Sequence, residues 1–315
     1  MAFEMSPAWE IEPAPPFRCD EALVLLAAGA SDDGLTAARA EALKKLLQAR
    51  GQYPPRLWWA RRGRQALAAA MVMESPGRMG MLLHASARAA GVDKEALART
   101  IAAASRDALE RGGLAFVQAL LAPHEGHDVA AVRASGFELL AVLAYMQLDL
   151  AGDVLPAQAG AVGWRSYGEF DERELADLIA ATYEGSLDCP RLSGLRSMAD
   201  VLESHKACGV FRPESWWIAV KEGSSAGCIL VNDSASRQTA EVVYMGVVPA
   251  HRRQGLGRAM LRRAAADARR HRRSALLLAV DERNLHAKSL YETEGYRQTH
   301  RQLAFIMTPS GPRED

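Results

Sequence analysis

The sequence predicts an α+β fold, a mixed β-sheet flanked by helices, and predicts that this arrangement occurs twice along the chain. Strand-like apolar segments alternate with helical segments, and some follow one another closely enough to form hairpins, which is typical of a mixed sheet covered by helices. Sequence landmarks also recur: Trp58-Trp59 returns as Trp216-Trp217 after 158 residues, and Gly136-Phe137 returns as Gly295-Tyr296 after 159. Self-similarity at a fixed spacing indicates a duplicated domain.

The two halves are expected to hold their elements in the same order. In the first half, apolar alternation and helical periodicity predict strands at residues 57–60, 66–73 and 79–84, a helix at 93–111, a strand at 114–121, a short helix ending near Gly136 and a strand at 137–150. In the second half they predict helices at 172–182 and 198–205, strands at 216–220, 227–231 and 241–248, a helix at 255–271, a strand at 275–280, a helix at 285–294 and a strand at 296–307. The segment 151–163 is small, weakly polar and contains Gly and Pro, so we expect a linker there. The predicted domains are therefore residues 1–150 and 151–315.

Composition favours a cytoplasmic protein with two cores of ordinary size. The chain has 315 residues, 49% of them apolar, and its 38 basic residues balance 38 acidic ones, so no net charge attracts it to nucleic acid or to a membrane surface. The four cysteines are scattered, as free thiols in a reducing compartment are. We expect no signal peptide, because no basic region leads into an apolar stretch at the N-terminus. The longest apolar runs, at 66–73 and 139–146, are too short to span a bilayer.

The densest chemical signal lies at residues 240–261, AEVVYMGVVPAHRRQGLGRAML. An apolar strand breaks at Pro249, and a helix begins after Gly255 and Gly257. The free N–H groups at the start of a helix, with its partial positive charge, form an anion site suited to a pyrophosphate. Glycine lets phosphates approach the main chain closely. Positive charge is added by Arg252, Arg253 and Arg258.

At these residues the sequence resembles the GNAT acetyltransferase superfamily. The acetyl-CoA motif of that family, Q/R-x-x-G-x-G/A after a strand, is matched by residues 247–259. Its second signature, N-x-x-A-x-x-L-Y-x-x-x-G-Y/F, is matched by Asn284, Ala287, Leu290, Tyr291, Gly295 and Tyr296. The resemblance implies two tandem GNAT-like domains, of which residues 151–315 form the acetyltransferase domain.

The resemblance also implies where acetyl-CoA binds. The strand at 245–248 would separate from its neighbour and hydrogen-bond the pantetheine arm, and the amides of residues 253–258 would hold the pyrophosphate. Asn284 would brace the far side of the cofactor, and Tyr291 would lie near its sulfur. The predicted cofactor contacts are Met245, Val247, Val248, Arg252, Arg253, Gln254, Gly255, Leu256, Gly257, Arg258, Asn284 and Tyr291.

Two residues are candidates for proton transfer. When an amine attacks the thioester, the phenol of Tyr291 can protonate the departing thiolate; the alternative is a packed aromatic whose hydroxyl has an ordinary partner. Glu241 begins the strand that leads into the glycine turn, and alternation would put Val243, Met245 and Val247 on its face. Desolvation there would raise the pKa of Glu241, as a base near neutral pH requires. Several GNAT families place their catalytic glutamate at this station, others use an ordered water, and a solvated glutamate at the strand start is the alternative.

The acceptor side is less clearly marked. Tyr183, Ser186 and Asp188 fall in YEGSLDCP, a polar segment between two predicted helices where GNAT enzymes commonly gather acceptor contacts, and Asp188 is suited to a cationic amine. A capped turn ended by Pro190 explains the same residues equally well. Cys189 has no base nearby in the sequence and is not expected to be a nucleophile. No metal site is expected, because only His124 and His127 have a suitable spacing.

The first half lacks the cofactor residues. An offset of 159 places Asp93, Ala96 and Ala98 opposite Arg252, Gly255 and Gly257, and Glu125 and Val132 opposite Asn284 and Tyr291. The glycine turn and the hydroxyl are absent from this half, and an acid replaces a base. Residues 1–150 are therefore expected to be a degenerate GNAT-like domain without a cofactor site.

The sequence thus predicts an N-acetyltransferase that moves acetyl from acetyl-CoA to a small-molecule or peptide amine by direct attack in a ternary complex. Two alternatives stay open: a transferase that uses another acyl-CoA, and a non-catalytic CoA-binding sensor or assembly module. Neither a nucleic acid nor a membrane is an expected partner. The acceptor and the oligomeric state are not written in the sequence, although two fused domains allow a monomer.

Overall fold

The computed structural model describes residues 9–28, 34–151 and 162–309, which form two compact units. Unit 1 holds the described residues up to Leu140 together with those from Leu303 onward, and unit 2 holds those from Ala141 to Gln302. The sequence analysis placed a single boundary at residue 150, whereas the chain enters unit 2 ten residues earlier and returns to unit 1 at Leu303. Most of the predicted linker, residues 152–161, lies outside the described residues.

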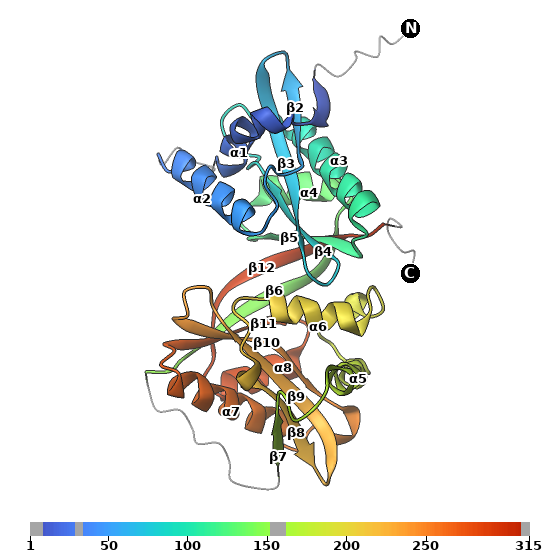
Figure 1. Cartoon of the computed structure of the whole chain (residues 1–315), viewed down its shortest axis with the longest axis vertical. Coiled ribbons are helices and arrows are strands. Elements are labelled where there is room, and N and C mark those ends of the chain that lie inside the picture. The colour runs from blue at the N-terminus through green and yellow to red at the C-terminus, as the bar shows by residue number, and fades with distance from the viewer. Residues whose placement is uncertain (1–8, 29–33, 152–161, 310–315) are drawn as a thin grey trace. The chain divides into compact units, whose positions relative to one another are not determined.

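The chain runs through one order of elements twice (Figure 1). The first series is β1 (Glu10–Pro13), α1 (Cys19–Ala27), α2 (Thr36–Ala49), β2 (Leu57–Arg62), β3 (Gln65–Ser75), β4 (Met79–His84), α3 (Lys94–Gly112), β5 (Phe116–Leu121), α4 (Gly126–Ala134) and β6 (Glu138–Asp149). The second series is β7 (Gly163–Ser166), α5 (Glu172–Tyr183), α6 (Met198–Ala207), β8 (Trp216–Lys221), β9 (Ser224–Asp233), β10 (Thr239–Val247), α7 (Leu256–Arg270), β11 (Ala275–Asp281), α8 (Leu285–Thr293) and β12 (Arg297–Met307). β5 and β11, α4 and α8, and β6 and β12 each begin 159 residues apart, so the predicted duplication is confirmed.

Every predicted strand and helix is present, with ends shifted by a few residues. The sequence analysis missed β1, β7, α1 and α2. The two strands have four residues each, too few to show a clear alternation. In α2 only Ala40 and Leu47 are buried, so this helix lacks the broad apolar stripe that marks an amphipathic helix.

Each unit contains a mixed sheet, as predicted. The strand order is β1-β2-β3-β4-β5-β12 in unit 1 and β6-β11-β10-β9-β8-β7 in unit 2. β4 and β5, and likewise β10 and β11, are parallel, whereas the hairpin neighbours are antiparallel. The closing strand of each series is exchanged: β6 pairs with β11 in unit 2, and the C-terminal part of β12 pairs with β5 in unit 1. The two closing strands carry similar apolar patterns, so the pattern alone cannot tell which sheet each one completes.

The strand register corrects the predicted alignment of the tryptophans. Leu57 in β2 and Trp216 in β8 occupy the same position, because their partners on the following strand are also 159 residues apart. Trp58 therefore corresponds to Trp217, not to Trp216. Their surroundings agree, since Trp58 packs against the core under α3 and Trp217 lies in the core under α7.

Helices cover both faces of each sheet (Figure 1). In unit 1 one core lies under α3 and α4 and includes Phe305 of β12, and a second core lies under α1 and α2 around Trp59. In unit 2 one core lies under α7 and α8 and includes Tyr291, and a second lies under α5 and α6 around Trp216. The two faces of the unit 2 sheet therefore differ in which motif they carry: the helices of both family signatures, α7 and α8, share one face.

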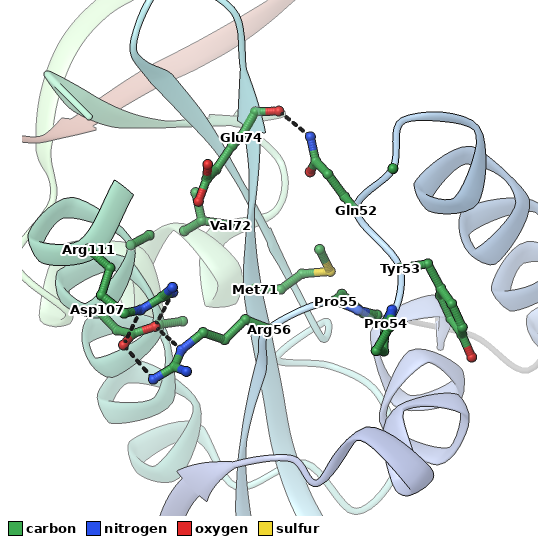
Figure 2. A pocket seen from close by; sticks show the side chains of 13 residues that line it. Gln52, Tyr53, Pro54, Pro55, Arg56, Met71, Val72, Glu74, Asp107 and Arg111 are labelled. Carbon is green, nitrogen blue, oxygen red and sulfur yellow. Dashed lines mark hydrogen bonds and ion pairs between the residues drawn. The ribbon is translucent and has the colours of Figure 1, made fainter. Parts of the chain in front are cut away.

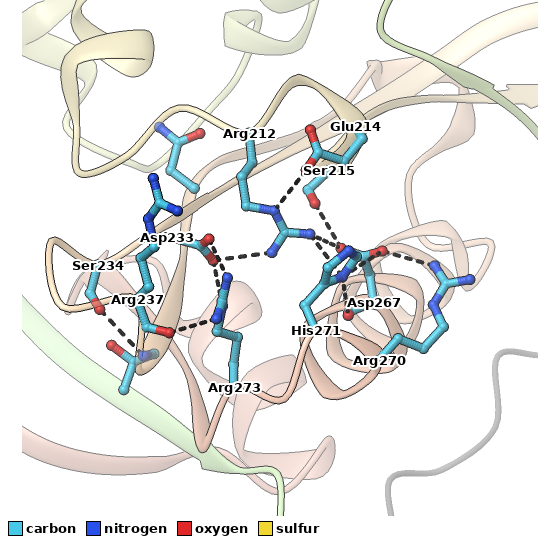
Figure 3. A network of polar contacts seen from close by, with 12 residues as sticks. Arg212, Glu214, Ser215, Asp233, Ser234, Arg237, Asp267, Arg270, His271 and Arg273 are labelled. Atoms are coloured by element: carbon cyan, nitrogen blue, oxygen red, sulfur yellow. Dashed lines mark hydrogen bonds and ion pairs between the residues drawn. The ribbon is translucent and has the colours of Figure 1, made fainter.

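A buried ion-pair network fixes α7 to the strands of unit 2 (Figure 3). Asp267 of α7 accepts hydrogen bonds from Arg212 at 3.0 Å and from Ser215 Oγ at 2.7 Å, and Arg212 also donates to Asp233 at 3.0 Å. Arg212 is 5% exposed and both aspartates are 3% exposed. Buried charges that are paired on several sides are expensive to disrupt, so this network holds the helix that begins at the glycine turn.

Unit 1 has an equivalent network around Asp107 of α3 (Figure 2). Asp107 accepts two hydrogen bonds from Arg56 and two from Arg111, at 2.6–2.8 Å. Burial acts to raise the pKa of Asp107, but the bonds from Arg111 and Arg56 outweigh it and the pKa is lowered. A network that recurs in both units belongs to their shared architecture.

A cavity of about 220 Å³ opens beside this network in unit 1 (Figure 2). It is lined by the segment 51–56, by Met71, Val72 and Glu74 of β3 and by α3 residues near Asp107. Its volume is below the roughly 300–1,000 Å³ that is usual for small-molecule sites, and none of its lining residues belongs to the two family signatures. The cavity therefore does not mark the candidate site.

Candidate functional site

The candidate site is built where two parallel strands of unit 2 separate. β10 and β11 pair over residues 239–241 and 275–277, and the register between them ends at Glu241 and Leu277, which we call the strand split. β10 continues along β9 to Val247, whereas β11 continues along β6 to Asp281. A bulge between Val242 and Tyr244 bends β10 just beyond the split. The separation predicted for residues 245–248 is thus present, and it begins earlier in β10.

The start of α7 follows the end of β10 and has no side-chain cap. Gly255 is the N-cap residue, with φ of 80°, a left-handed conformation that favours glycine. A Cβ built on Gly255 would have no heavy atom within 4 Å, so the space in front of the helix is open. The first N–H groups of a helix have no partner inside it, and here they are available to an anion.

Gly257 serves packing instead of phosphate approach. A Cβ at this position would lie 3.0 Å from Cδ2 of Leu290 in α8. The missing side chain lets α7 and α8 approach each other, so the predicted role of Gly257 in admitting phosphates is corrected. Its neighbour Leu256 is 2% exposed and anchors the first turn of α7 in the core. Only the main-chain amides of these two residues face the helix start.

Arg252 ties the glycine turn to the end of α5. Its guanidinium donates to the main-chain oxygens of Val247 and Thr182 at 3.0 Å and of Glu184 at 2.5 Å. The sequence analysis gave this side chain a charge role at the phosphates. The structure instead engages it with carbonyl groups, so Arg252 positions the turn against α5.

The other polar side chains of the turn also have partners. Arg253 contacts His286 at 2.8 Å, Gln254 accepts a hydrogen bond from Lys221, and Arg258 pairs with Glu294 at 2.7 Å. Arg253 has φ of 61°, a conformation that is uncommon for residues other than glycine and is frequent at functional sites. The side chain of Arg258 is 40% exposed, so it remains reachable from the side of the turn.

Glu241 lies at the strand split, on a face that differs from the predicted one. Its neighbours Ala240 and Val242 lie in the core under α7, and Met245 and Val247 pack against that same core. Alternation therefore turns Glu241 to the opposite face, and the bulge shifts the later residues out of step. The prediction that Met245 and Val247 share its face is wrong. Burial nevertheless raises the pKa of Glu241, and among the described residues nothing donates a hydrogen bond to its carboxylate.

Tyr291 and Asn284 both lie in the α8 signature. Asn284 is the N-cap of α8 and accepts the N–H of Ala287 at 3.2 Å, which fixes the start of the helix. Tyr291, two turns further along, is 8% exposed, and its ring lies 5.9 Å from that of Tyr296. Burial and the charge of Asp188 raise the pKa of Tyr291. The phenol is therefore protonated at neutral pH, the state that a proton donor needs.

Asp188 connects the loop after α5 to the end of β11. Its carboxylate accepts the N–H of Asp281 at 2.9 Å. Burial raises the pKa of Asp188, and the charge of Asp281 adds to that effect. Burial also acts to raise the pKa of Asp281, but hydrogen bonds from Arg283 outweigh it and the pKa is lowered. The pair thus consists of one firmly ionised carboxylate, which the sequence analysis missed, and one whose ionised form is less favoured.

The remaining acceptor candidates have different surroundings. Ser186 accepts the N–H of Asp188 at 3.2 Å, as expected if the segment is a turn that presents this carboxylate. Tyr183 is the last residue of α5, and its ring lies 6.1 Å from Tyr244 in an edge contact. Burial, together with Asp188 and Asp281, raises the pKa of the Cys189 thiol to about 12, which agrees with a residue that is not a nucleophile.

A polar aromatic group beside the split was not predicted. The hydroxyl of Tyr244 in β10 lies 2.5 Å from Thr182 Oγ1, and the ring of His205 in α6 lies 5.2 Å from the Tyr244 ring. Burial, with a contribution from Arg196, lowers the pKa of His205 to about 4, so this ring is neutral at physiological pH. The three residues come from three elements, and no spacing in the sequence links them.

Unit 1 has a carboxylate where unit 2 has open space. Asp93 is the N-cap of α3, and its side chain accepts the N–H of Ala96 at 2.9 Å. α3 and α7 begin 162 residues apart, so Asp93 corresponds to Gly255 and not, as the offset of 159 indicated, to Arg252. In unit 1 a side chain therefore bonds to an amide of the kind that would otherwise be open to an anion. Val132, opposite Tyr291, is fully buried and has no hydroxyl.

Two searches of the described residues limit other site types. In this part of the chain no helix is long and apolar enough to cross a membrane. The same residues contain no group of three or more His, Cys, Asp or Glu side chains arranged to hold a metal ion.

Comparison with known sequences points to unit 2. The profile described as Acetyltransferase (GNAT) family matches residues 179–296, which include α6, α7, α8 and strands β8 to β11. N-acetyltransferase family 8 member 3 of Rattus norvegicus is 30% identical over 110 residues, which cover 32% of this chain and 45% of that protein. The match thus spans less than half of the relative.

Solved structures extend the similarity to both units. A GCN5-related N-acetyltransferase from Sphaerobacter thermophilus has a TM-score of 0.63 at 17% identity, covering 99% of this chain and 98% of that chain. A tandem GNAT protein from the clavulanic acid biosynthesis pathway has a TM-score of 0.57 at 16% identity, covering 97% and 100%. At these identities the similarity shows the fold, two tandem GNAT-like domains.

Proposed function

Unit 2 of this chain belongs to the GNAT acetyltransferase family, and on that premise we propose that the protein transfers acetyl from acetyl-CoA to the nitrogen of an amine. The observation that carries this proposal is the uncapped start of α7 directly after the strand split. An anion-binding helix terminus and a strand edge without a partner lie within one short segment, residues 242–258.

The residues present fit the cofactor. A pyrophosphate needs several N–H donors and a main chain that it can approach, and the open space at Gly255 meets both needs. The main chain of Met245 and Val247 would pair with the pantetheine arm along the open edge of β10. Val248 would contribute its carbonyl group, because its N–H donates to Ala226. Arg253 and Arg258 would flank the phosphates, and Arg252 would position the turn.

When bound, acetyl-CoA supplies an acetyl group activated as a thioester. The attacking amine must lose a proton, and Glu241 at the strand split is the proposed base, directly or through an ordered water. Its raised pKa brings its basicity closer to that of an amine acceptor. Tyr291 is the proposed acid, because it is buried, protonated and carried on the signature helix.

Asp188 is the proposed contact for the positive charge of the acceptor. Its position near Tyr291 follows from its effect on the pKa of that phenol. Tyr183 and Ser186 would shape the same side, Tyr183 through the ring packing on Tyr244 and Ser186 through the turn that presents Asp188. The acceptor would be a small-molecule or peptide amine, bound with acetyl-CoA in a ternary complex.

Residues 1–150 are proposed to form a degenerate domain without a cofactor site. The support is the carboxylate of Asp93, which caps α3 at the position of Gly255. A pyrophosphate brought to this helix start would meet a negative charge and an amide that is already bonded.

The test is release of free thiol from acetyl-CoA by the full chain, measured against a broad panel of primary amines, with CoA binding followed by calorimetry. Thiol release that depends on the amine is the expected result. Release from a longer acyl-CoA but not from acetyl-CoA would move the proposal to another acyl donor. Binding of CoA without release for any amine would replace the enzyme with a sensor or assembly module, and absence of CoA binding would refute the proposal altogether.

A further inference from the structure

The face of the unit 2 sheet that carries Glu241 is open beside the strand split. Ala240, Val242, Leu276 and Leu278 point into the core under α7, so Glu241, Leu277 and Ala279 point to the other face. All three are half-buried, whereas their neighbours on the core side are buried. One strip of the sheet thus remains accessible at the point where β10 and β11 part.

Tyr145 of β6 extends this strip. It pairs with Ala279 across β11, two residues beyond the split in the direction in which the strands separate. Cross-strand partners place their side chains on the same face, so Tyr145 stands beside Ala279 on the face of Glu241. We call Glu241, Leu277, Ala279 and Tyr145 the acceptor strip.

The ring of Tyr145 is held in place. It stacks on His300 of β12 with centroids 4.4 Å apart and planes inclined by 13°, and the main-chain oxygen of Tyr145 accepts a hydrogen bond from Thr299 Oγ1 at 3.2 Å. Burial and the charge of Glu241 raise the pKa of Tyr145, which shows that the two side chains lie close to each other. In the described residues no hydrogen bond is made by the phenol oxygen. A fixed ring beside an unbonded carboxylate is suited to binding a ligand.

The chemistry of the strip selects among amines. Its only ionisable carboxylate is Glu241, at the closed end, and the rest is the apolar surface of Leu277 and Ala279 and the ring of Tyr145. An ammonium group would bind at the carboxylate, where an aromatic ring nearby adds a cation–π attraction. The body of the ligand would then lie along apolar side chains, which favour an apolar group over one that needs hydrogen bonds.

From this geometry we infer that the acceptor is a primary amine carried on an apolar body, and that Tyr145 is the residue that determines this specificity. The inference rests on the proposed acetyl transfer. It also gives the first half of the chain a direct part in the site, because β6 closes the first series of elements and yet lies in unit 2.

The experiment uses the full chain and a matched pair of amines. Hexylamine and 2-(2-aminoethoxy)ethanol have the same length, but the second replaces two carbons by oxygen. The variants are Tyr145→Ala and Tyr145→Phe, with Gln147→Ala as the control. Gln147 lies on the same strand, is exposed and pairs with Leu277 at the closed side of the split. Thermal unfolding and CoA calorimetry establish that each variant is folded and binds the cofactor.

We expect hexylamine to have a kcat/KM about tenfold above that of its polar partner. Tyr145→Ala is expected to raise the KM for hexylamine about tenfold with the KM for acetyl-CoA unchanged, whereas Tyr145→Phe and Gln147→Ala keep the wild-type values. An unchanged amine KM in Tyr145→Ala, or no preference between the two amines, overturns the inference.

If the chain binds CoA but does not turn over, the same pair is titrated by calorimetry into the CoA-loaded protein. Hexylamine binding that Tyr145→Ala weakens upholds the inference while the proposed catalysis fails. Absence of hexylamine binding overturns the inference, and any turnover with other amines would leave the proposed function standing.

Discussion

Replacing Gly255 by aspartate tests the position of the cofactor most directly. The backbone there has φ of 80°, and a Cβ would meet no heavy atom within 4 Å. The substitution therefore costs only the left-handed conformation, about 1–2 kcal/mol, of which a negative charge at a helix N-terminus returns about 0.3–1 kcal/mol. The protein is expected to stay folded, with a loss of stability of about 1 kcal/mol.

The effect on binding is expected to be much larger. Two unit charges 4 Å apart repel by about 4 kcal/mol at an effective dielectric constant near 20, and each 1.4 kcal/mol corresponds to about a tenfold change in affinity. Allowing for screening and for rotation of the side chain, CoA affinity should fall at least about 100-fold. Asp93 illustrates the physical cause, because its carboxylate already bonds to an amide at the start of α3.

The assay is calorimetric titration of CoA into the full chain. Gly255→Asn separates charge from strain, since it has the same shape without the charge and should weaken binding by no more than about tenfold. Gly223→Asp is the matched control, because Gly223 also has a left-handed backbone, φ of 79°, and open space around a built Cβ, in the β8–β9 turn. Wild-type CoA affinity in a folded Gly255→Asp variant would refute the placement of the pyrophosphate.

Four further outcomes are expected. Tyr291→Phe should lower kcat about 100-fold without changing CoA affinity in calorimetry, and full activity would remove this phenol from the mechanism. Glu241→Gln should abolish the acidic limb of the kcat/KM profile. It should also stabilise the fold at neutral pH but not well below pH 4.5, because burial penalises only the ionised carboxylate, whose pKa is raised in the folded state; an unaltered limb points to another base. For His205, the folded pKa of about 4 lies below the unfolded value of 6.5, so its contribution of about 3 kcal/mol is lost as pH falls between these values. Urea unfolding of His205→Gln should show a correspondingly weaker dependence over that range, and an equal dependence contradicts the argument. The full chain should bind one equivalent of CoA, and two equivalents would show that unit 1 binds it as well.

The extent of prediction from sequence followed the range of the signal. Strand and helix positions were predicted well, because alternation and helical periodicity are local, and β4 was found with its observed ends at 79–84. The glycine turn was placed correctly at a helix start after a strand. The sequence could not divide the work of the two glycines, since Gly255 is needed for its φ and Gly257 for the distance between α7 and α8, and a letter code shows neither.

Features that depend on pairing were out of reach. The face of Glu241 was predicted wrongly because one bulge in β10 breaks the period of two, and bulges leave no fixed mark in a sequence. The three-residue shift at Asp93 arose because an offset taken from the closing strands does not hold in the segment before the helix. Arg252 looked like a phosphate ligand by its charge, but its partners are carbonyl oxygens of α5, 63 to 70 residues away or closer along the fold's own turn.

The exchange of closing strands has a consequence for how the chain is made. A ribosome releases the first series of elements long before residues 303–307 exist, yet these residues complete the sheet of unit 1, where Phe305 is fully buried. Until they arrive, β5 lacks its neighbour, and an open strand edge is prone to wrong pairing. The first unit to be synthesised is thus finished last, and its final assembly waits for the C-terminus of the protein.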